Sequence, residues 1–190
     1  VGLDNSHSML AVARANLERT EIRGVDLRQG DVYSPPVEPG FDVVVLHQVL
    51  HFLEDPARAV HEARRLLAPG GRLLIVDFAP HSLEFLRAEH AHRRLGFRAD
   101  TVTAWLEQVG LATSAPRLIA PPDRSDVLAR ERLVVTLWLG TDTSGLADLA
   151  MAAADEMIAR VTGAHLEGLL GVLRVACQQL DAVTARGTGL

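Results

Sequence analysis

The first half of the chain alternates between short apolar runs and segments with helical spacing. Residues 1–3 predict a short strand, and the apolar positions of residues 9–17 recur as they do along one face of a helix. Residues 25–29 alternate apolar and polar side chains like an outer strand. The β-branched run of residues 41–46 is typical of a strand that is covered on both faces of a parallel sheet.

A further helix and strand follow at similar spacing. Asp55-Pro56 opens a predicted helix over residues 57–67, because Pro is favoured in the first turn of a helix. Pro69-Gly70-Gly71 ends that helix, and residues 72–77 form another buried apolar run. Strands that alternate with helices in this way predict an α/β fold with a doubly wound, mostly parallel sheet.

The second half of the chain is divided by a change in composition near residue 140. Helices are predicted over residues 85–95 and 101–109, and strands over residues 117–120 and 133–139. Beyond the linker-like residues 141–145, β-branched residues become rare. The pattern therefore predicts a sheet domain over residues 1–140 and a helical extension over residues 141–190. The extension carries a continuous apolar stripe, which favours homodimerisation through its helices.

Composition limits the classes of partner. The chain has 190 residues, a net charge of −5 and acidic residues interspersed among the basic ones, so no nucleic-acid-binding face is expected. Neither an apolar run of membrane-spanning length nor a targeting signal occurs in it, which favours a cytoplasmic protein without membrane contact. Its one cysteine, Cys177, lies in an apolar stretch typical of a buried thiol.

Polar residues follow all four predicted strands of the first half. Ligands of doubly wound sheets bind beyond the carboxyl ends of the strands, where these residues are expected to lie. A carboxylate there can accept both hydroxyls of a ribose, although Asp4 alone also fits a helix cap. The residues are Asp4 after the first strand, Asp31 after the second, His47 and Gln48 after the third, and Asp77 with His81 after the fourth.

Residues 1–139 contain several short motifs in a fixed order. These are Gly2-Leu3-Asp4-Asn5-Ser6 with Ser8-Met9-Leu10, Gly30-Asp31-Val32, Phe41-Asp42-Val43-Val44-Val45-Leu46-His47-Gln48-Val49-Leu50-His51-Phe52-Leu53 with Asp55-Pro56, and Leu66-Leu67-Ala68-Pro69-Gly70-Gly71-Arg72-Leu73. In order, spacing and residue type they resemble the class I S-adenosylmethionine-dependent methyltransferases of the quinone C-methyltransferase-like kind. The resemblance implies a Rossmann-like sheet and S-adenosylmethionine as cofactor.

The resemblance also implies roles for individual residues. It implies that Asp4 binds the ribose hydroxyls, that Met9 or its neighbour Asn5 lies against the adenine, and that Asp31 and the Val32 backbone meet the adenine edge. By the same resemblance, His47 and Gln48 lie near the methionine part of the cofactor.

Methyl transfer to a small-molecule acceptor needs a base only when the acceptor must lose a proton, and His51 or His81 is a candidate for that role. A zinc site is not favoured, because neither a cysteine nor a carboxylate stands at ligand spacing from the histidines. We expect His90 and His92 to form a solvated basic face with neighbouring arginines.

The sequence departs from the family's pattern at its start. In the family, a strand that ends in an acidic residue and a glycine-rich loop precede the strand that is first here. Their absence would leave two unpaired strand edges and predicts that these 190 residues alone are inactive. The chain is therefore expected to be a piece of a longer protein, the alternative being a degenerate relative that binds no cofactor.

A narrower resemblance concerns residues 77–97. Asp77-Phe78-Ala79-Pro80-His81 and His90-Ala91-His92-Arg93-Arg94-Leu95-Gly96-Phe97 look like a bacterial group in which a winged-helix regulator precedes the methyltransferase domain. The alternative function that follows is a non-enzymatic, adenosyl-ligand-sensing domain of a transcription regulator.

Overall fold

The computed structural model describes residues 1–20, 22–119 and 133–144. These residues lie in a compact unit, Val1–Gly145, and a second unit comprises Leu146–Leu190. The predicted helical extension, its apolar stripe, the proposed dimer contact and Cys177 lie outside the described residues, so those expectations stay predictions. No helix within the described ranges is long and apolar enough to cross a membrane.

The N-terminal part of the unit is a two-stranded parallel sheet with one helix. β1 (Gly2–Asp4) pairs with β2 (Leu27–Gln29), and α1 (His7–Thr20) connects them. Ser6 caps the helix, because its hydroxyl accepts a hydrogen bond from the amide of Met9 at 3.3 Å. These elements confirm the predicted strand, helix, strand order.

A larger mixed sheet follows. Its strands are β3 (Phe41–His47), β4 (Leu67–Phe78), β5 (Leu111–Thr113), β6 (Arg117–Ile119) and β7 (Val135–Asp142). The order is β3-β4-β7-β5, with β6 also paired to β7. β3 and β4 are parallel, as predicted, whereas β7 is antiparallel to β4, β5 and β6. β7 also runs two residues beyond the predicted end of the sheet domain at residue 140.

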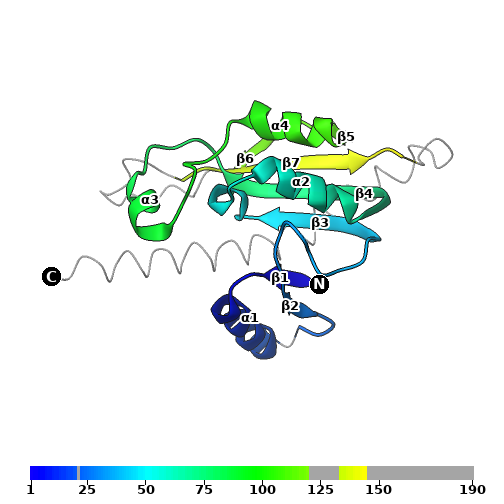
Figure 1. Cartoon of the computed structure of the whole chain (residues 1–190), viewed down its shortest axis with the longest axis vertical. Helices are drawn as coiled ribbons and strands as arrows, with labels where there is room; N and C mark the ends of the chain where they lie inside the picture. The colour runs from blue at the N-terminus through cyan, green and yellow to red at the C-terminus, as the bar shows by residue number, and fades with distance from the viewer. Residues whose placement is uncertain (21, 120–132, 145–190) are drawn as a thin grey trace. The chain divides into compact units, whose positions relative to one another are not determined.

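The two sheets share no strand pairing within the described residues. β1 pairs with β2 alone, and β3 pairs with β4 alone, so each leaves one edge open in this part of the chain. Figure 1 shows β1 and β2 as a pair apart from the larger sheet.

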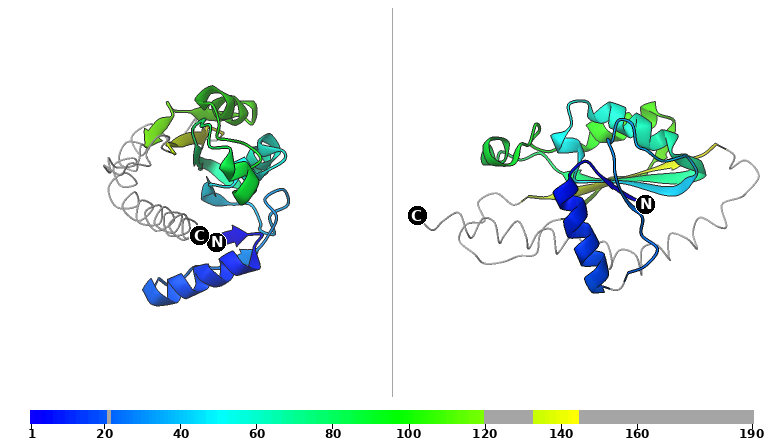
Figure 2. Two further views of the ribbon diagram at one scale, coloured as in Figure 1. Left: turned by 90° about the vertical axis from the view of Figure 1, so that its left-hand side faces the viewer. Right: turned by 60° about the horizontal axis from the view of Figure 1, so that its bottom comes forward.

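Two helices cover one face of the larger sheet. α2 (Pro56–Arg65) begins at Asp55, whose carboxylate accepts a hydrogen bond from the Arg58 amide at 3.0 Å, and α4 (Ala99–Gln108) lies beside it. Figure 2 shows both helices on the same side of the strands. Between helices and sheet lies the apolar core, which comprises Leu46, Leu50, Ala59, Val60, Ala63, Leu67, Leu73, Ile75, Phe97, Val102, Leu106, Leu111 and Trp138.

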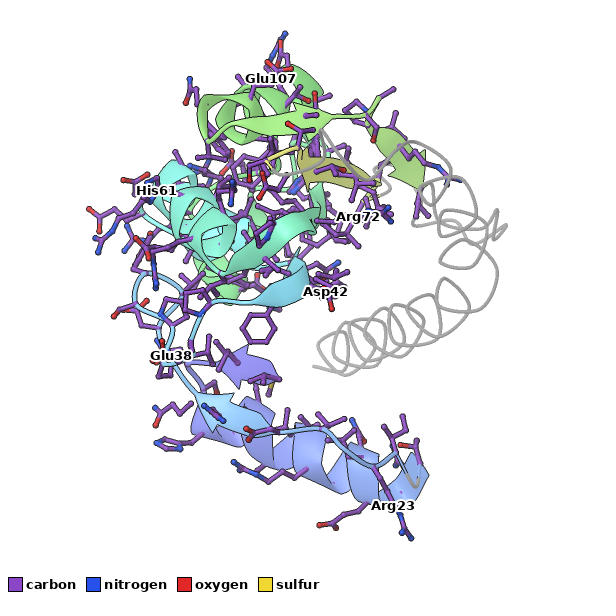
Figure 3. All side chains as sticks on the ribbon, turned by 90° about the vertical axis from the view of Figure 1, so that its right-hand side faces the viewer. Arg23, Glu38, Asp42, His61, Arg72 and Glu107 are labelled. Atoms are coloured by element: carbon purple, nitrogen blue, oxygen red, sulfur yellow. The ribbon has the colours of Figure 1, made fainter. Side chains whose placement is uncertain are left out.

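The prediction that residues 41–46 are buried on both faces is wrong. Val43 and Val45 are 52% and 41% exposed, and they lie on the face that α2 and α4 do not cover. Figure 3 shows Arg72 of β4 on the opposite side of the sheet from His61 of α2. The β-branched run therefore reflects strand propensity on the open face and burial on the other.

Two local predictions also need correction, and two short elements were not predicted. The predicted helix over residues 85–95 is shorter, because α3 (Phe85–His90) ends where Ala91 takes a left-handed conformation, φ 57°. Leu67 belongs to β4 and pairs with Phe41, so α2 ends earlier than predicted. The short strand β5 and the 3₁₀ turn η1 (Leu50–Phe52) have too few residues for a periodic signal.

Candidate functional site

Asp4 and Asp31 follow neighbouring parallel strands, as predicted. The Asp4 carboxylate accepts a hydrogen bond from the Ser6 amide at 2.7 Å, and the Asp31 carboxylate accepts one from the Tyr33 amide at 2.9 Å. The amide of Gly30 donates to the carbonyl of Asp4 at 3.1 Å, which ties the two strand ends together. Both carboxylates are exposed and form no ion pair with any described residue.

The other residues expected beside the adenosine lie close to Asp4 or Asp31 in the sequence. Met9, in the first turn of α1, is 52% exposed. Asn5 is exposed, and its carbonyl accepts a hydrogen bond from the Gln29 side chain at 3.2 Å. Val32 is half-buried and packs against the core of the larger sheet. Ser6 rather than Asp4 caps α1, because the amide that Asp4 binds is that of Ser6, which precedes the helix. The second carboxylate oxygen of Asp4 accepts no hydrogen bond from a described residue.

His47 and Gln48 lie where β3 ends. Gln48 has a left-handed backbone, φ 47°, and its amide donates to the carbonyl of Val76 at 2.7 Å. Burial lowers the pKa of the His47 imidazole, while the nearby Asp77 acts in the opposite direction. His47 Nε2 is buried and has no hydrogen-bond partner among the described residues.

Asp77 is a fully buried carboxyl group near the carboxyl end of β4. It accepts hydrogen bonds from the amide of Leu50 at 3.0 Å and from its neighbour Phe78 at 2.8 Å. Its third partner is His51 Nδ1, 2.7 Å away. A buried carboxyl group with three hydrogen-bond partners is held in one position.

His51 lies on the turn η1 and is 1% exposed. With a carboxylate as its acceptor, Nδ1 carries the hydrogen and Nε2 keeps its lone pair. Nε2 is buried, and no residue in the described part of the chain is its hydrogen-bond partner. Three rings surround this imidazole, with centroid distances of 4.1 Å to Phe52, 5.0 Å to Phe78 and 4.2 Å to His92.

The structure overturns the expected basic face at His92. Its side chain is 9% exposed and packs on His51, because the left-handed Ala91 turns the chain inward after α3. Burial, with the charges of His51, His81 and His90, lowers the pKa of the His92 imidazole to about 4. Asp77 acts in the opposite direction. Because the sequence predicts a helix through residue 95, it gave no sign that the side chain of His92 is buried.

His81, the other candidate base, follows β4 on the same edge of the sheet. Its Nδ1 accepts a hydrogen bond from the amide of Leu83 at 3.3 Å, and its backbone amide donates to Leu95 at 3.1 Å. Its ring meets Phe78 edge-on at 5.9 Å. In the neutral ring, the nitrogen that accepts a hydrogen bond is the one with the lone pair, so Nε2 carries the hydrogen.

The predicted residues thus form two groups. Asp4, Asn5, Met9 and Asp31 lie in and beside the small sheet, whereas His47, Gln48, His51 and His81 lie with Asp77 at the carboxyl ends of β3 and β4. In the second group, the side chains of His51 and Asp77 are buried. The first offers exposed acceptors for hydroxyl groups.

Comparisons with known proteins bear on the family and the fold. Residues 1–75 match the family model described as a methyltransferase domain. The chain is 40% identical over 76 residues, 40% of its length, to an uncharacterized 37.1 kDa protein in transposon Tn4556 of Streptomyces fradiae, and covers 21% of that protein. It is 35% identical over 78 residues, 40% of its length, to demethylmenaquinone methyltransferase of Lactococcus lactis, and covers 31% of it.

Solved structures show the same fold. Phosphoethanolamine N-methyltransferase 2 of Haemonchus contortus, in complex with S-adenosyl-L-methionine, superposes with a TM-score of 0.56 at 16% identity over 74% of this chain and 42% of that one. The chain spans less than a third of the length of the two curated relatives above. Residues 1–75 therefore have the sequence of a methyltransferase domain, and the chain has the class I methyltransferase fold.

Proposed function

We propose that this chain is part of an enzyme that transfers a methyl group from S-adenosylmethionine to a small-molecule acceptor. The observation that carries the proposal is the pair of exposed carboxylates, Asp4 and Asp31, at the ends of neighbouring parallel strands. They lie inside the segment that matches the methyltransferase domain. No cationic side chain of the described residues neutralises them, so they favour a ligand that is rich in hydroxyl and amino donors.

The residues present fit the adenosine half of this cofactor. Asp4 has a free carboxylate oxygen for the ribose hydroxyls, and the exposed Met9 supplies an apolar contact for the adenine. Asp31 would accept from the adenine amino group, with the Val32 amide beside it. His47 and Gln48 would lie toward the methionine part.

When bound, S-adenosylmethionine supplies an electrophilic methyl group on a sulfonium. The protein's part is then to orient the acceptor, to exclude water and, where the acceptor is protonated, to remove its proton. We propose that His51 Nε2 takes this proton. Asp77 holds Nδ1–H at 2.7 Å, which leaves the lone pair on Nε2 and stabilises the imidazolium that forms.

The geometry favours His51 over His81 as the base. In His81 the accepting nitrogen, Nδ1, is already used by the Leu83 amide. In His51 the accepting nitrogen has no partner among the described residues. His81 would therefore have to break a backbone hydrogen bond before it could accept a proton, whereas His51 would not.

Titration calorimetry with S-adenosylhomocysteine tests the cofactor assignment. It is done on the full-length protein, which we expect to bind this ligand. Asp4→Ala should weaken binding by roughly 10- to 100-fold, the scale of a lost charge-assisted hydrogen bond.

A matched control is Asp26→Ala, which removes an exposed carboxylate at the opposite end of β2. It should leave the affinity unchanged. Equal affinity for the wild type and Asp4→Ala would refute the ribose assignment, and an equal loss in both variants would point to a nonspecific charge effect.

A further inference from the structure

The segment between α3 and α4, residues 91–97, crosses the carboxyl ends of β3 and β4, and we name it the clasp. Figure 1 shows α3 beyond the carboxyl end of β3. At one end of the clasp, Gly96 lies so close to the residue after β4 that an added Cβ would clash with the carbonyl oxygen of Ala79. At the same place the Phe97 amide donates to Phe78 at 2.8 Å. The clasp is thus fixed to the sheet.

The middle of the clasp is bound to the turn that carries His51. The amides of Arg93 and Arg94 both donate to the carbonyl of His51, at 3.0 and 3.1 Å. The Arg94 guanidinium donates to the carbonyls of Leu53 and Glu54. Four donor nitrogens in two adjacent residues therefore hold the backbone of η1 and the residues after it.

His92 is the clasp residue whose side chain reaches the His51 ring. The two imidazoles are tilted by 32°, with centroids 4.2 Å apart, and His92 also stacks on Phe78 at 5.9 Å. Its Nδ1, like Nε2 of His51, is buried and has no hydrogen-bond partner within residues 1–20, 22–119 and 133–144. A ring that cannot rotate away from its neighbours keeps the tautomer that its one hydrogen bond selects.

We infer that His92 is a positioning residue that holds His51 in the orientation in which Nδ1–H faces Asp77 and the lone pair is on Nε2. The contact acts through the ring of His92 rather than through its charge. The inference rests on the proposed role of His51 as the base, but its test needs neither cofactor nor methyl transfer. Failure of the two proposals is therefore distinguishable.

The test is the tautomer of His51, read from ring ¹⁵N chemical shifts of the full chain at neutral pH. The wild type should show a protonated Nδ1 and an unprotonated Nε2. In His92→Ala the His51 signal should shift toward a mixture of the two tautomers. Exchange of its Nδ1 proton with water should become roughly tenfold faster, as a loss of about 1.4 kcal/mol would produce.

His92→Phe retains a ring without nitrogens and should restore both the wild-type tautomer and slow exchange. His90→Ala, which removes a histidine two residues earlier, should leave His51 unchanged. Buried Trp138 reports by its fluorescence that each variant is folded. The inference is overturned if folded His92→Ala keeps the wild-type tautomer and exchange rate, or if His92→Phe fails to restore them.

Discussion

Two buried carboxyl groups lie at opposite ends of the antiparallel pair β4 and β7, and they have different partners. Asp77, at the carboxyl end of β4, is bonded to two backbone amides and to His51. Asp142, at the other end, pairs with Arg64 at 3.0 Å and accepts hydrogen bonds from the amide and hydroxyl of Ser144. Both are nearly inaccessible to water.

The two carboxyl groups also differ in the unpaired nitrogen atoms that lie near them. Around Asp77 the buried nitrogens without a hydrogen-bond partner among the described residues include those of the His47, His51 and His92 imidazoles. Around Asp142 the unpartnered nitrogen is Nε of the Arg64 guanidinium. The imidazoles therefore lie at the end of the sheet where α/β proteins bind ligands, and an ion pair lies at the opposite end.

The largest expected effect is that of Asp77→Ala. The substitution leaves His51 Nδ1 and the amides of Leu50 and Phe78 buried without their acceptor, which should lower the free energy of unfolding by about 3–5 kcal/mol. Urea titration followed by tryptophan fluorescence measures this. Asp77→Asn keeps one oxygen and should lose less. A loss under about 1 kcal/mol in the alanine variant would mean that this carboxyl does not organise its end of the sheet.

The pH dependence of the free energy of unfolding should also differ between the two ends of the β4–β7 pair. The pKa of His92 is lowered from 6.5 to about 4 in the folded protein, so the unfolded chain binds the extra proton between these values. Its contribution to stability is therefore complete above pH 6.5 and is lost as the pH falls toward 4. The loss should be of order 2 kcal/mol.

Asp142 contributes in a separate, more acidic window. Burial alone would raise the pKa of its carboxyl group, but the hydrogen bonds from Ser144, with Arg64, hold it below 3.8. Its contribution is lost only as the pH falls below that value. Urea midpoints at pH 7 and pH 5 should therefore differ more in the wild type than in His92→Phe. If the urea midpoint changes equally between pH 7 and pH 5 in the wild type and in His92→Phe, a group other than His92 causes the loss of stability in this pH range.

Much of this arrangement could be predicted from local patterns. The run after Phe41 and the capped helix after Asp55 were located within two residues, because strand propensity and Pro at the helix start act locally. The residues at the strand ends followed from topology alone, since parallel strands place their carboxyl ends together.

The contacts around His51 could not be predicted in this way. They depend on a chain reversal at Ala91, a residue with no intrinsic preference for the left-handed conformation, and on the fit of Gly96 against Ala79. Both are tertiary requirements that leave the apolar pattern of residues 85–95 unchanged. Likewise, the exposure of Val43 depends on which helices cover the sheet, and its own sequence neighbourhood does not encode that.

The smallest expected effect is that of Asp142→Ala. Arg64 is 26% exposed, so after loss of its partner it can turn toward water instead of remaining as a buried charge. Ser144 is exposed and can bond to water as well. We therefore expect a loss of about 1–2 kcal/mol at pH 7, measured by the same urea titration. Asp142→Asn, which keeps an acceptor for Ser144, should recover part of it. A loss as large as that of Asp77→Ala would show that both ends of the β4–β7 pair depend equally on their carboxyl groups. The two ends would then differ only in the imidazoles near Asp77.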